Sequence, residues 1–356
     1  MNPANLLDAA VERLGEMWAI TLAGLLIGAL FGFFAQKSRF CLRSAVIEFA
    51  RNTTGGKLTV WLFAFATAVG LTQAFIALGW LDVSDARQLA ARGSVSGALI
   101  GGAMFGAGMI LARGCASRLL VLAANGNLRS LLSGLVFAVV ATASLGGILS
   151  PLRLWLAELW TVDGGSARDL IAITGIGHGG ALAFAGLWLA AAVFWARRQQ
   201  VPPWGWAGGV GVGAMVALAW LVTYAVSRRA FDVIVGVQSL SFTGPAADVL
   251  LLVLSPPGQP LKFDIGLVPG VFVGSFVAAA LARELKLEGF QGGPAMRRYI
   301  AGAVLMGFGG MLAGGCAGGA GVSGAAVFTL TAWVTLFAMW GAAMATDWWV
   351  DRRHEP

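Results

Sequence analysis

The chain has 356 residues, of which 58% are hydrophobic and only 12% are charged. Soluble domains carry about 25% charged residues, so this composition excludes a soluble globular protein and indicates a helical membrane protein. The net charge of +7 does not require a nucleic-acid partner, because membrane proteins collect Lys and Arg in their cytoplasmic loops. Two histidines and three cysteines are too few for a convincing metal site, and we expect no cofactor.

The first residues of the chain do not form an apolar leader. Asp8, Glu12, Arg13 and Glu16 are interleaved with apolar side chains at helical spacing. This spacing predicts a short amphipathic helix on the membrane surface and no cleavable signal peptide.

Nine apolar segments that could cross a membrane follow in the chain. They are expected near residues 17–36, 58–80, 97–113, 130–150, 170–196, 204–226, 264–282, 299–313 and 325–346. These segments predict an all-α membrane protein with a single transmembrane domain over residues 1–356. The third and eighth segments are close to the minimum spanning length, which favours half-helices that end inside the membrane.

The distribution of Lys and Arg sets the expected orientation. With the N-terminus outside, sixteen of the twenty-four basic residues fall on the cytoplasmic side. The positive-inside rule therefore favours an outside N-terminus and a cytoplasmic C-terminus.

One glycine-rich stretch occurs twice in the sequence. Residues 101–116 (GGAMFGAGMILARGCA) and 302–317 (GAVLMGFGGMLAGGCA) agree at eight of sixteen positions at an offset of 201. Each copy is an apolar segment that ends in a Gly-Cys pair. Short interrupted segments in corresponding halves of a membrane protein indicate a transport site near the bilayer centre.

The two copies lie on the third and eighth predicted crossings, and this odd separation reverses their direction through the bilayer. We therefore expect an inverted repeat with a pseudo-two-fold axis in the membrane plane. Repeat one would span about residues 17–150 and repeat two about residues 204–346, with residues 170–196 as the connector. At an offset of 202, Phe40-Cys41 also matches Phe242-Thr243, and neither stretch is typical of a spanning helix.

The three cysteines all fall at breaks in the apolar pattern. Cys41 lies in a polar interruption, whereas Cys115 and Cys316 end the two repeated segments. A buried cysteine is often only a small apolar side chain, but the repeat-matched positions favour a function for these three. A disulfide between Cys115 and Cys316 is an alternative.

Thiols at a narrow point of a membrane path suit a soft, sulfur-bearing anion. A thiol is a weak, polarisable hydrogen-bond donor and is uncharged near neutral pH. Transport requires several weak sites that the ion can leave again. Backbone N–H groups at helix N-termini opening from the glycine-rich breaks could balance the charge of the anion.

Several residues around the breaks could contribute to such a path. Arg113 and Arg118 flank Cys115, and charged residues at membrane depth are often functional. The alternative is that both are ordinary basic residues of the cytoplasmic side. Ser117 and Asn127 could donate to an anion or cap helices. The further candidates are Arg39, Thr243, Gly114 and Gly315.

Several motifs of the chain resemble those of a known family. The stretches SRFC, GAGMILARGCASRLL, GNLRSL, SFTGP and GFGGMLAGGCAGG are similar, in this order, to those of the YeeE/YedE family of bacterial inner-membrane proteins, whose characterised members import thiosulfate. The resemblance implies inverted halves, a cavity on each face and a central path. It also implies that Cys41, Cys115 and Cys316 relay the terminal sulfur of thiosulfate through S–H hydrogen bonds.

The resemblance also implies a partner and leaves other substrates open. Family members often act with a small cytoplasmic sulfur carrier of the TusA type, which we expect here as a separate chain. We expect a non-enzymatic protein of the bacterial inner membrane that takes up thiosulfate. The alternatives are transport of another sulfur or selenium compound, a membrane sulfurtransferase that forms a cysteine persulfide, and a structural subunit of a larger complex.

Overall fold

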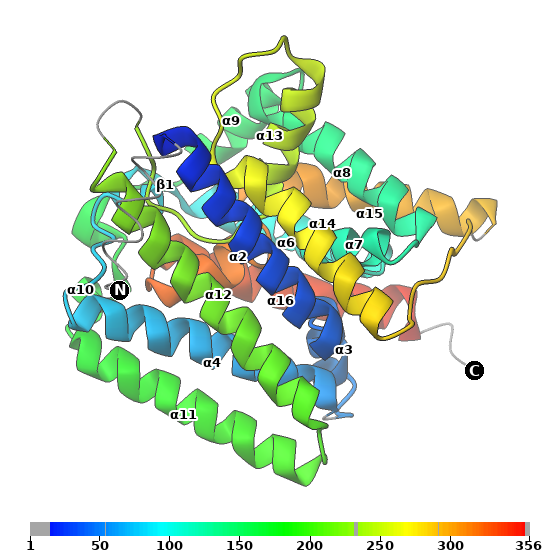
Figure 1. Ribbon diagram of the computed structural model, residues 1–356, viewed down its shortest axis with the longest axis horizontal. Helices are drawn as coiled ribbons and strands as arrows, with labels where there is room; N and C mark the ends of the chain where they lie inside the picture. Colours follow the sequence, from blue (N-terminus) through cyan, green and yellow to red (C-terminus); the bar gives the residue numbers. More distant parts are fainter. Residues whose placement is uncertain (1–14, 54, 231–233, 291, 353–356) are drawn as a thin grey trace.

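A computed structural model describes residues 15–53, 55–230, 234–290 and 292–352. The chain is mainly helical, and long helices lie side by side across the molecule (Figure 1). The amphipathic helix expected around Asp8 and Glu12 lies outside the described residues.

The long helices are separated by short helices and a two-stranded sheet. The long helices are α2 (Glu16–Ser38), α4 (Gly56–Ala77), α6 (Val95–Leu111), α8 (Leu128–Gly146), α11 (Gly177–Arg198), α12 (Pro203–Ser227), α14 (Phe263–Leu281), α15 (Gly293–Leu312) and α16 (Leu330–Val350). The short elements are α3 (Leu42–Ala50), α5 (Arg87–Ala90), β1 (Gly93–Ser94), α7 (Ala116–Ala124), α9 (Ser150–Glu158), β2 (Thr161–Val162), η1 (Gly165–Ala167), α10 (Leu170–Thr174), α13 (Thr243–Leu254) and η2 (Gly319–Gly324).

Seven helical segments are long and apolar enough to cross a membrane, counted over the residues that the structure describes. They include α2 with α3 and α6 with α7, which each count as one segment, and they identify an all-α, multi-pass membrane protein. The remaining two expected crossings correspond to α15, which carries Arg297 and Arg298 in its first turns, and to α16, which contains several Trp and Thr residues and Asp347. The count of nine therefore stays a prediction.

The two Gly-Cys segments pack directly against each other as α6 and α15. A Cβ atom added to Gly101 would lie 2.5 Å from the carbonyl oxygen of Gly309, and one added to Gly108 would lie 2.6 Å from that of Gly302. These contacts run in opposite directions along the two helices, so α6 and α15 are antiparallel. Glycine allows this approach because it removes the side chains between the two backbones.

Two further helix pairs touch through glycine. Gly24, Gly28 and Gly32 of α2 face the backbone of α14, and Gly209 and Gly213 of α12 face the backbone of α4. In Figure 1, α2 and α14 cross the centre of the view side by side, and α12 and α4 lie next to them. In lipid the hydrophobic effect does not hold helices together, so close backbone packing of this kind supplies much of the cohesion.

The pairings have a regular pattern. The contact of α6 with α16 corresponds to the contact of α15 with α8. In the same way, the contact of α2 with α14 corresponds to the contact of α12 with α4. Gly106 of α6 contacts Met339, while Gly307, its match at an offset of 201, contacts Phe137 and Val140. A two-fold axis between the halves would produce this exchange of partners. The inverted repeat as a whole, with the assignment of residues 17–150 and 204–346 to its halves, stays a prediction.

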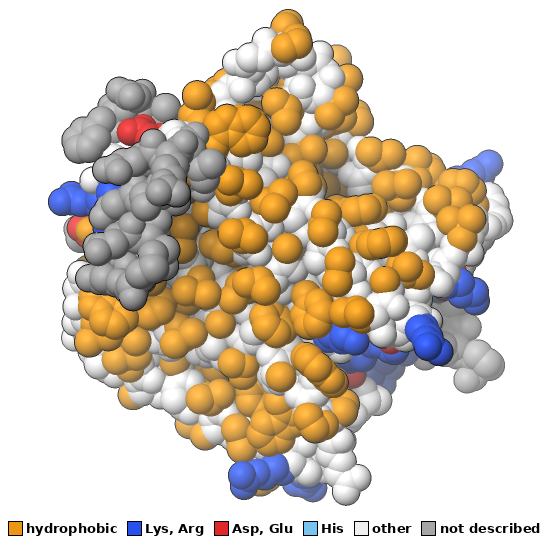
Figure 2. Space-filling view, viewed as in Figure 1, with side chains coloured by type: hydrophobic (Ala, Val, Ile, Leu, Met, Phe, Trp, Pro, Cys, Tyr) orange, Lys and Arg blue, Asp and Glu red, His pale blue; other side chains and the backbone are white. Residues whose placement is uncertain are grey.

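The surface fits a lipid environment. Figure 2 shows hydrophobic side chains over most of the visible face, with Lys and Arg side chains at its lower and right-hand edges, near the ends of α11, α14 and α15. Arg197 and Arg198 end α11, and Arg283 follows α14. An apolar face bordered by basic residues is typical of a protein that lies in a bilayer.

The contact between α6 and α15 gives the first prediction. Replacing Gly101 with Ala places a Cβ atom 2.5 Å from the Gly309 oxygen, so the helices must separate. Overpacking of this kind costs about 1–3 kcal/mol. We expect a clear fall in the thermal stability of the purified protein in detergent.

The matched control is Gly134→Ala in α8, where the added Cβ atom meets nothing within 4 Å. Its effect should be neutral or slightly stabilising, because Ala favours helix more than Gly. Equal stability of Gly101→Ala and Gly134→Ala would show that the backbones are not in contact.

Candidate functional site

Each cysteine follows the same type of helix ending. Helices α2, α6 and α15 all close with a residue in the left-handed conformation, whose successor donates its N–H to the carbonyl five residues back. These bonds join Phe40 to Ala35 at 3.0 Å, Gly114 to Met109 at 3.1 Å and Gly315 to Gly310 at 2.9 Å. The left-handed residues, with φ of 55°, 54° and 78°, are Arg39, Arg113 and Gly314.

The cysteine comes next and begins a new helical segment. The carbonyl of Cys41 accepts from Ala45, that of Cys115 from Leu119 and that of Cys316 from Ala320, at 3.2, 2.9 and 2.8 Å. Each thiol therefore lies at the N-terminus of a helical segment, where the backbone N–H groups carry partial positive charge. Gly319 donates its N–H to Cys316 Sγ at 3.4 Å.

The structure brings two of the three thiols together. The side chains of Cys41 and Cys115 lie side by side and interact through their thiols. Ser117 is close as well, because its Oγ lies 3.5 Å from Cys115 Sγ. All three cysteines are buried and free, so the disulfide considered between Cys115 and Cys316 is absent from the structure.

Positive charge lies beside this pair. Arg118 is near enough to both thiols for its charge to act on them, and Arg43 is near Cys41. The Nη1 atom of Arg118 is buried and has no hydrogen-bond partner among the described residues. A buried guanidinium donor without an acceptor is costly, and an anion beside the two thiols would supply one.

The third thiol lies near a different break. Gly318 faces both Cys316 Sγ and the ring of Phe242, and Gly310 faces the hydroxyl of Thr243. The structure thus places Thr243, the match of Cys41 at an offset of 202, near the second Gly-Cys turn. Phe31 connects the two regions, since its ring centroid is 5.3 Å from that of Phe242 and 6.5 Å from that of Phe40.

A cavity of about 860 Å³ reaches the second Gly-Cys turn from one face of the protein. We call it the vestibule, and its floor consists of Ser241, Thr243, Gly310, Gly314, Gly315 and Gly319. Its walls carry both signs of charge, among them Arg87, Arg153, Lys262, Asp248 and Asp264. Burial lowers the pKa of the Arg153 guanidinium, and the charge of Arg87 lowers it further.

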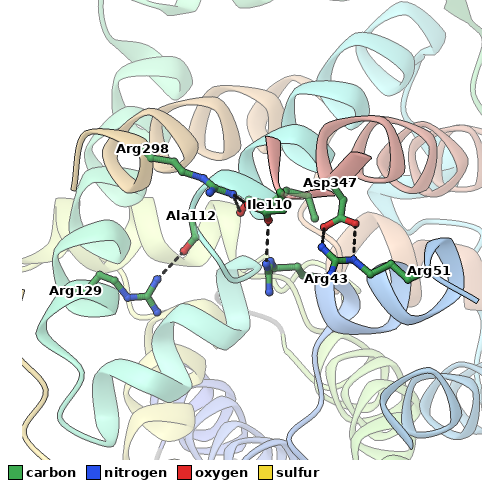
Figure 3. Close-up of polar contacts among 8 residues, drawn as sticks. Arg43, Arg51, Ile110, Ala112, Arg129, Arg298 and Asp347 are labelled. Carbon is green, nitrogen blue, oxygen red and sulfur yellow. Dashed lines mark hydrogen bonds and ion pairs between the residues drawn. The ribbon is translucent and has the colours of Figure 1, made fainter. Parts of the chain in front are cut away.

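Arginines from other helices bind the C-terminal end of α6, which leads into the Cys115 turn (Figure 3). Arg129 donates to the carbonyl oxygen of Ala112 at 3.1 Å and lies 4.6 Å over the ring of Tyr299. Arg298 donates to the carbonyl oxygen of Ile110 at 3.5 Å. Cations at a helix C-terminus satisfy its free carbonyls and oppose its dipole.

Two aspartates of the α16 C-terminus order further arginines at this face. Arg51 binds Asp347 through two hydrogen bonds of 3.0 and 3.1 Å (Figure 3). Asp351 pairs with Arg298 at 2.8 Å and with Arg43 at 3.8 Å. No pattern in the sequence pointed to these pairs, because the partners are far apart in the chain. Only the position of Arg43 two residues after Cys41 could have drawn attention to it.

Three of the predicted site residues have other surroundings. Asn127 caps α8 by accepting from Ser130 N at 2.8 Å, and its amide nitrogen donates to Glu288. Arg39 is exposed and pairs with Glu284 at 3.6 Å. Arg113 is exposed as well. Asn127 thus acts as a helix cap, the alternative that its position allowed, and the two arginine side chains are exposed rather than buried with the thiol pair.

Comparison with known proteins identifies the family of this chain. Residues 37–345 match the family described as sulphur transport. The thiosulfate transporter TsuA of Escherichia coli is 27% identical over 361 aligned positions, which cover 94% of this chain and 96% of the relative. The thiosulfate transporter TsuA of Spirochaeta thermophila is 27% identical over 331 positions, covering 87% of this chain and 93% of the relative. Since the match covers most of its length, the chain belongs to the sulphur transport (YeeE/YedE) family.

Proposed function

We propose that this protein takes up thiosulfate across the bacterial inner membrane, with its N-terminus outside and its C-terminus in the cytoplasm. Two relatives that cover nearly the whole chain are named thiosulfate transporters, which supports the substrate. The observation that supports the site best is that the buried thiols of Cys41 and Cys115 lie together near Arg118, whose Nη1 has no hydrogen-bond partner in the part of the chain that the structure describes.

In this proposal the ion moves from the vestibule to Cys316 and then to the Cys41–Cys115 pair. The vestibule reaches the turn that carries Cys316, and the aromatic contacts of Phe31 connect this region with the other turn. The expected orientation puts the vestibule outside and the arginines of Figure 3 inside. The two halves of the inverted repeat then each contribute a turn to one path.

Neutral thiols suit this task because they bind the ion without trapping it. The terminal sulfur of thiosulfate is soft and accepts weak S–H hydrogen bonds, whereas helix N-termini balance the charge on its oxygens. Arg118 adds a full positive charge at the inner pair, and Gly319 occupies the matching position at Cys316. This difference makes the inner position the stronger of the two for a dianion.

Arg39 and Arg113 have a separate part in the proposal. Both have the left-handed backbone conformation that residues other than glycine rarely adopt. The matching residue in the Cys316 turn is Gly314. Retaining a strained arginine beside a path favours a function for its charge. We assign these two residues to electrostatic attraction at the cytoplasmic mouth, where a separate TusA-like sulfur carrier would receive the sulfur compound.

The thiols give the second prediction. Replacing Cys41, Cys115 or Cys316 with Ala removes one donor, and we expect thiosulfate uptake into proteoliposomes to fall at least about tenfold for each variant. Serine variants should keep part of the activity, because a hydroxyl also donates. Gel filtration and melting curves provide the control for folding. Normal uptake by the triple alanine variant would contradict the proposal.

A second candidate function is a membrane sulfurtransferase. Arg118 near the thiols favours this reading, because positive charge stabilises a thiolate. The thiolate would attack the terminal sulfur of thiosulfate, form a cysteine persulfide and release sulfite. Transport of another sulfur or selenium compound is the remaining alternative, which uptake assays with sulfate, sulfite and selenite would separate.

Mass spectrometry distinguishes the relay from the transferase. After incubation with thiosulfate and removal of excess ion, we expect the intact protein to keep its mass, because hydrogen bonds leave no covalent product. A gain of one sulfur atom that disappears on treatment with a thiol reductant, and that is absent in Cys115→Ala, would favour the transferase.

A further inference from the structure

Thr243 carries a hydroxyl that its surroundings leave without a partner. The side chain is 1% exposed, and Oγ1 has no hydrogen-bond partner among the described residues. A threonine inside a helix usually donates to the carbonyl one turn earlier, as Thr335 does to Thr331 at 2.8 Å. Thr243 lacks this option because it is the first residue of α13. A buried hydroxyl without a partner costs about 1–3 kcal/mol, so a ligand that accepts from it would be favoured.

Thr243 belongs to the lining of the vestibule. Thr243 lines the cavity together with Ser241 and three glycines of the second Gly-Cys turn. Any side chain at Gly310 would cover the hydroxyl, since a Cβ atom there would lie 2.7 Å from Thr243 Oγ1. A Cβ atom at Gly319 would likewise collide with the hydroxyl of Ser241. Glycine at both positions therefore leaves room for the two hydroxyls beside the vestibule lining, where Thr243 is buried.

The segment before Thr243 is fixed by hydrogen bonds at successive residues. Thr223 donates to the carbonyl of Gln238 at 2.6 Å, and Ser239 donates to that of Val216 at 2.7 Å. Ser323 donates to the carbonyl of Leu240 at 2.7 Å, which joins the segment to η2. A site held in this way needs little reorganisation when an ion binds.

The electrostatics of the floor favour the oxygen end of an anion. Helix α13 has twelve residues and begins at Thr243, and the turn after Cys316 also opens a helical segment. The N-terminus of α13 lies at the vestibule floor, because Thr243 and Gly244 line it. Free N–H groups of a first helical turn stabilise negative charge.

The three cysteine turns and the break before α13 differ in one chemical respect. Three present a thiol, and the fourth presents the hydroxyl of Thr243 at the position that matches Cys41. Thiosulfate has two unlike ends: its sulfonate oxygens are hard acceptors, for which an O–H group is the better donor, and its terminal sulfur is soft. A hydroxyl and a thiol at one floor would hold these ends in a fixed direction.

We propose that Thr243 is an orienting residue of the entry site, where it donates to a sulfonate oxygen of thiosulfate so that the terminal sulfur faces Cys316. This inference rests on the proposed function and adds the recognition of the oxygen end. It also predicts selectivity for an ion with both kinds of acceptor, because sulfate offers no soft end to Cys316.

The test measures thiosulfate uptake in proteoliposomes over a range of concentrations. Thr243→Val removes the hydroxyl and keeps the shape, and we expect KM to rise about tenfold or more with little change in the maximal rate. Thr243→Ser keeps the hydroxyl and should stay within about threefold of the wild-type KM. The matched control is Thr72→Val, because the Thr72 hydroxyl is also buried and unpartnered among the described residues but is not part of the vestibule lining.

Three results would overturn the inference. The first is a KM for Thr243→Val equal to the KM of the wild type and of Thr72→Val. In that case, a loss of uptake in Cys316→Ala would leave the proposed function standing. Equal losses in Thr243→Ser and Thr243→Val would show that packing rather than the hydroxyl matters. An absence of thiosulfate uptake by the wild-type protein would overturn the inference and the proposed function together.

Discussion

The backbone contact between α6 and α15 is the constraint on which the rest of the architecture depends. Glycines on both helices bring the chains close enough that an added Cβ atom would meet a carbonyl oxygen. Because the two helices are antiparallel, their Gly-Cys turns point to opposite faces of the protein. One turn then reaches the vestibule floor, and the other meets Cys41 near the arginines of Figure 3.

The turns themselves join local backbone physics to chemistry. A left-handed residue ends the helix, the next residue closes the hydrogen-bonded turn, and the cysteine starts a new helical segment. A thiol at that position lies beside backbone N–H groups, so a soft sulfur group and partial positive charge occur together. The same combination recurs with a hydroxyl at Thr243. In the proposed function this arrangement forms a path for a sulfur-bearing ion.

Much of the fold was accessible from the sequence because it depends on local patterns. The offset of 201 selected the two glycine-rich stretches that form α6 and α15, and apolar runs located helices such as α12 and α14 to within a residue or two. The expected segment at residues 170–196 is instead divided, because Gly175 ends α10 in the left-handed conformation before α11 begins. Periodicity alone does not reveal such a break.

The site was accessible only in part, since its contacts join distant segments. Repeat matching selected Cys115, Cys316 and Thr243, but nothing in the spacing indicated that Cys41 lies against Cys115 rather than Cys316. The partners of Arg43 and Arg51 on α16 were also out of reach. Asn127 shows the opposite case, in which a residue near a motif has a structural task as a helix cap.

The central claim is that the thiols lie on one passage with openings at opposite faces. The most direct measurement uses variants that keep a single cysteine, labelled by a membrane-impermeant thiol reagent in right-side-out and inside-out vesicles, with and without thiosulfate. The account predicts that Cys316 reacts from the vestibule side, that Cys115 reacts from the other side, and that thiosulfate but not sulfate slows both reactions. Labelling of both thiols from the same side, or rates unaffected by thiosulfate, would contradict it.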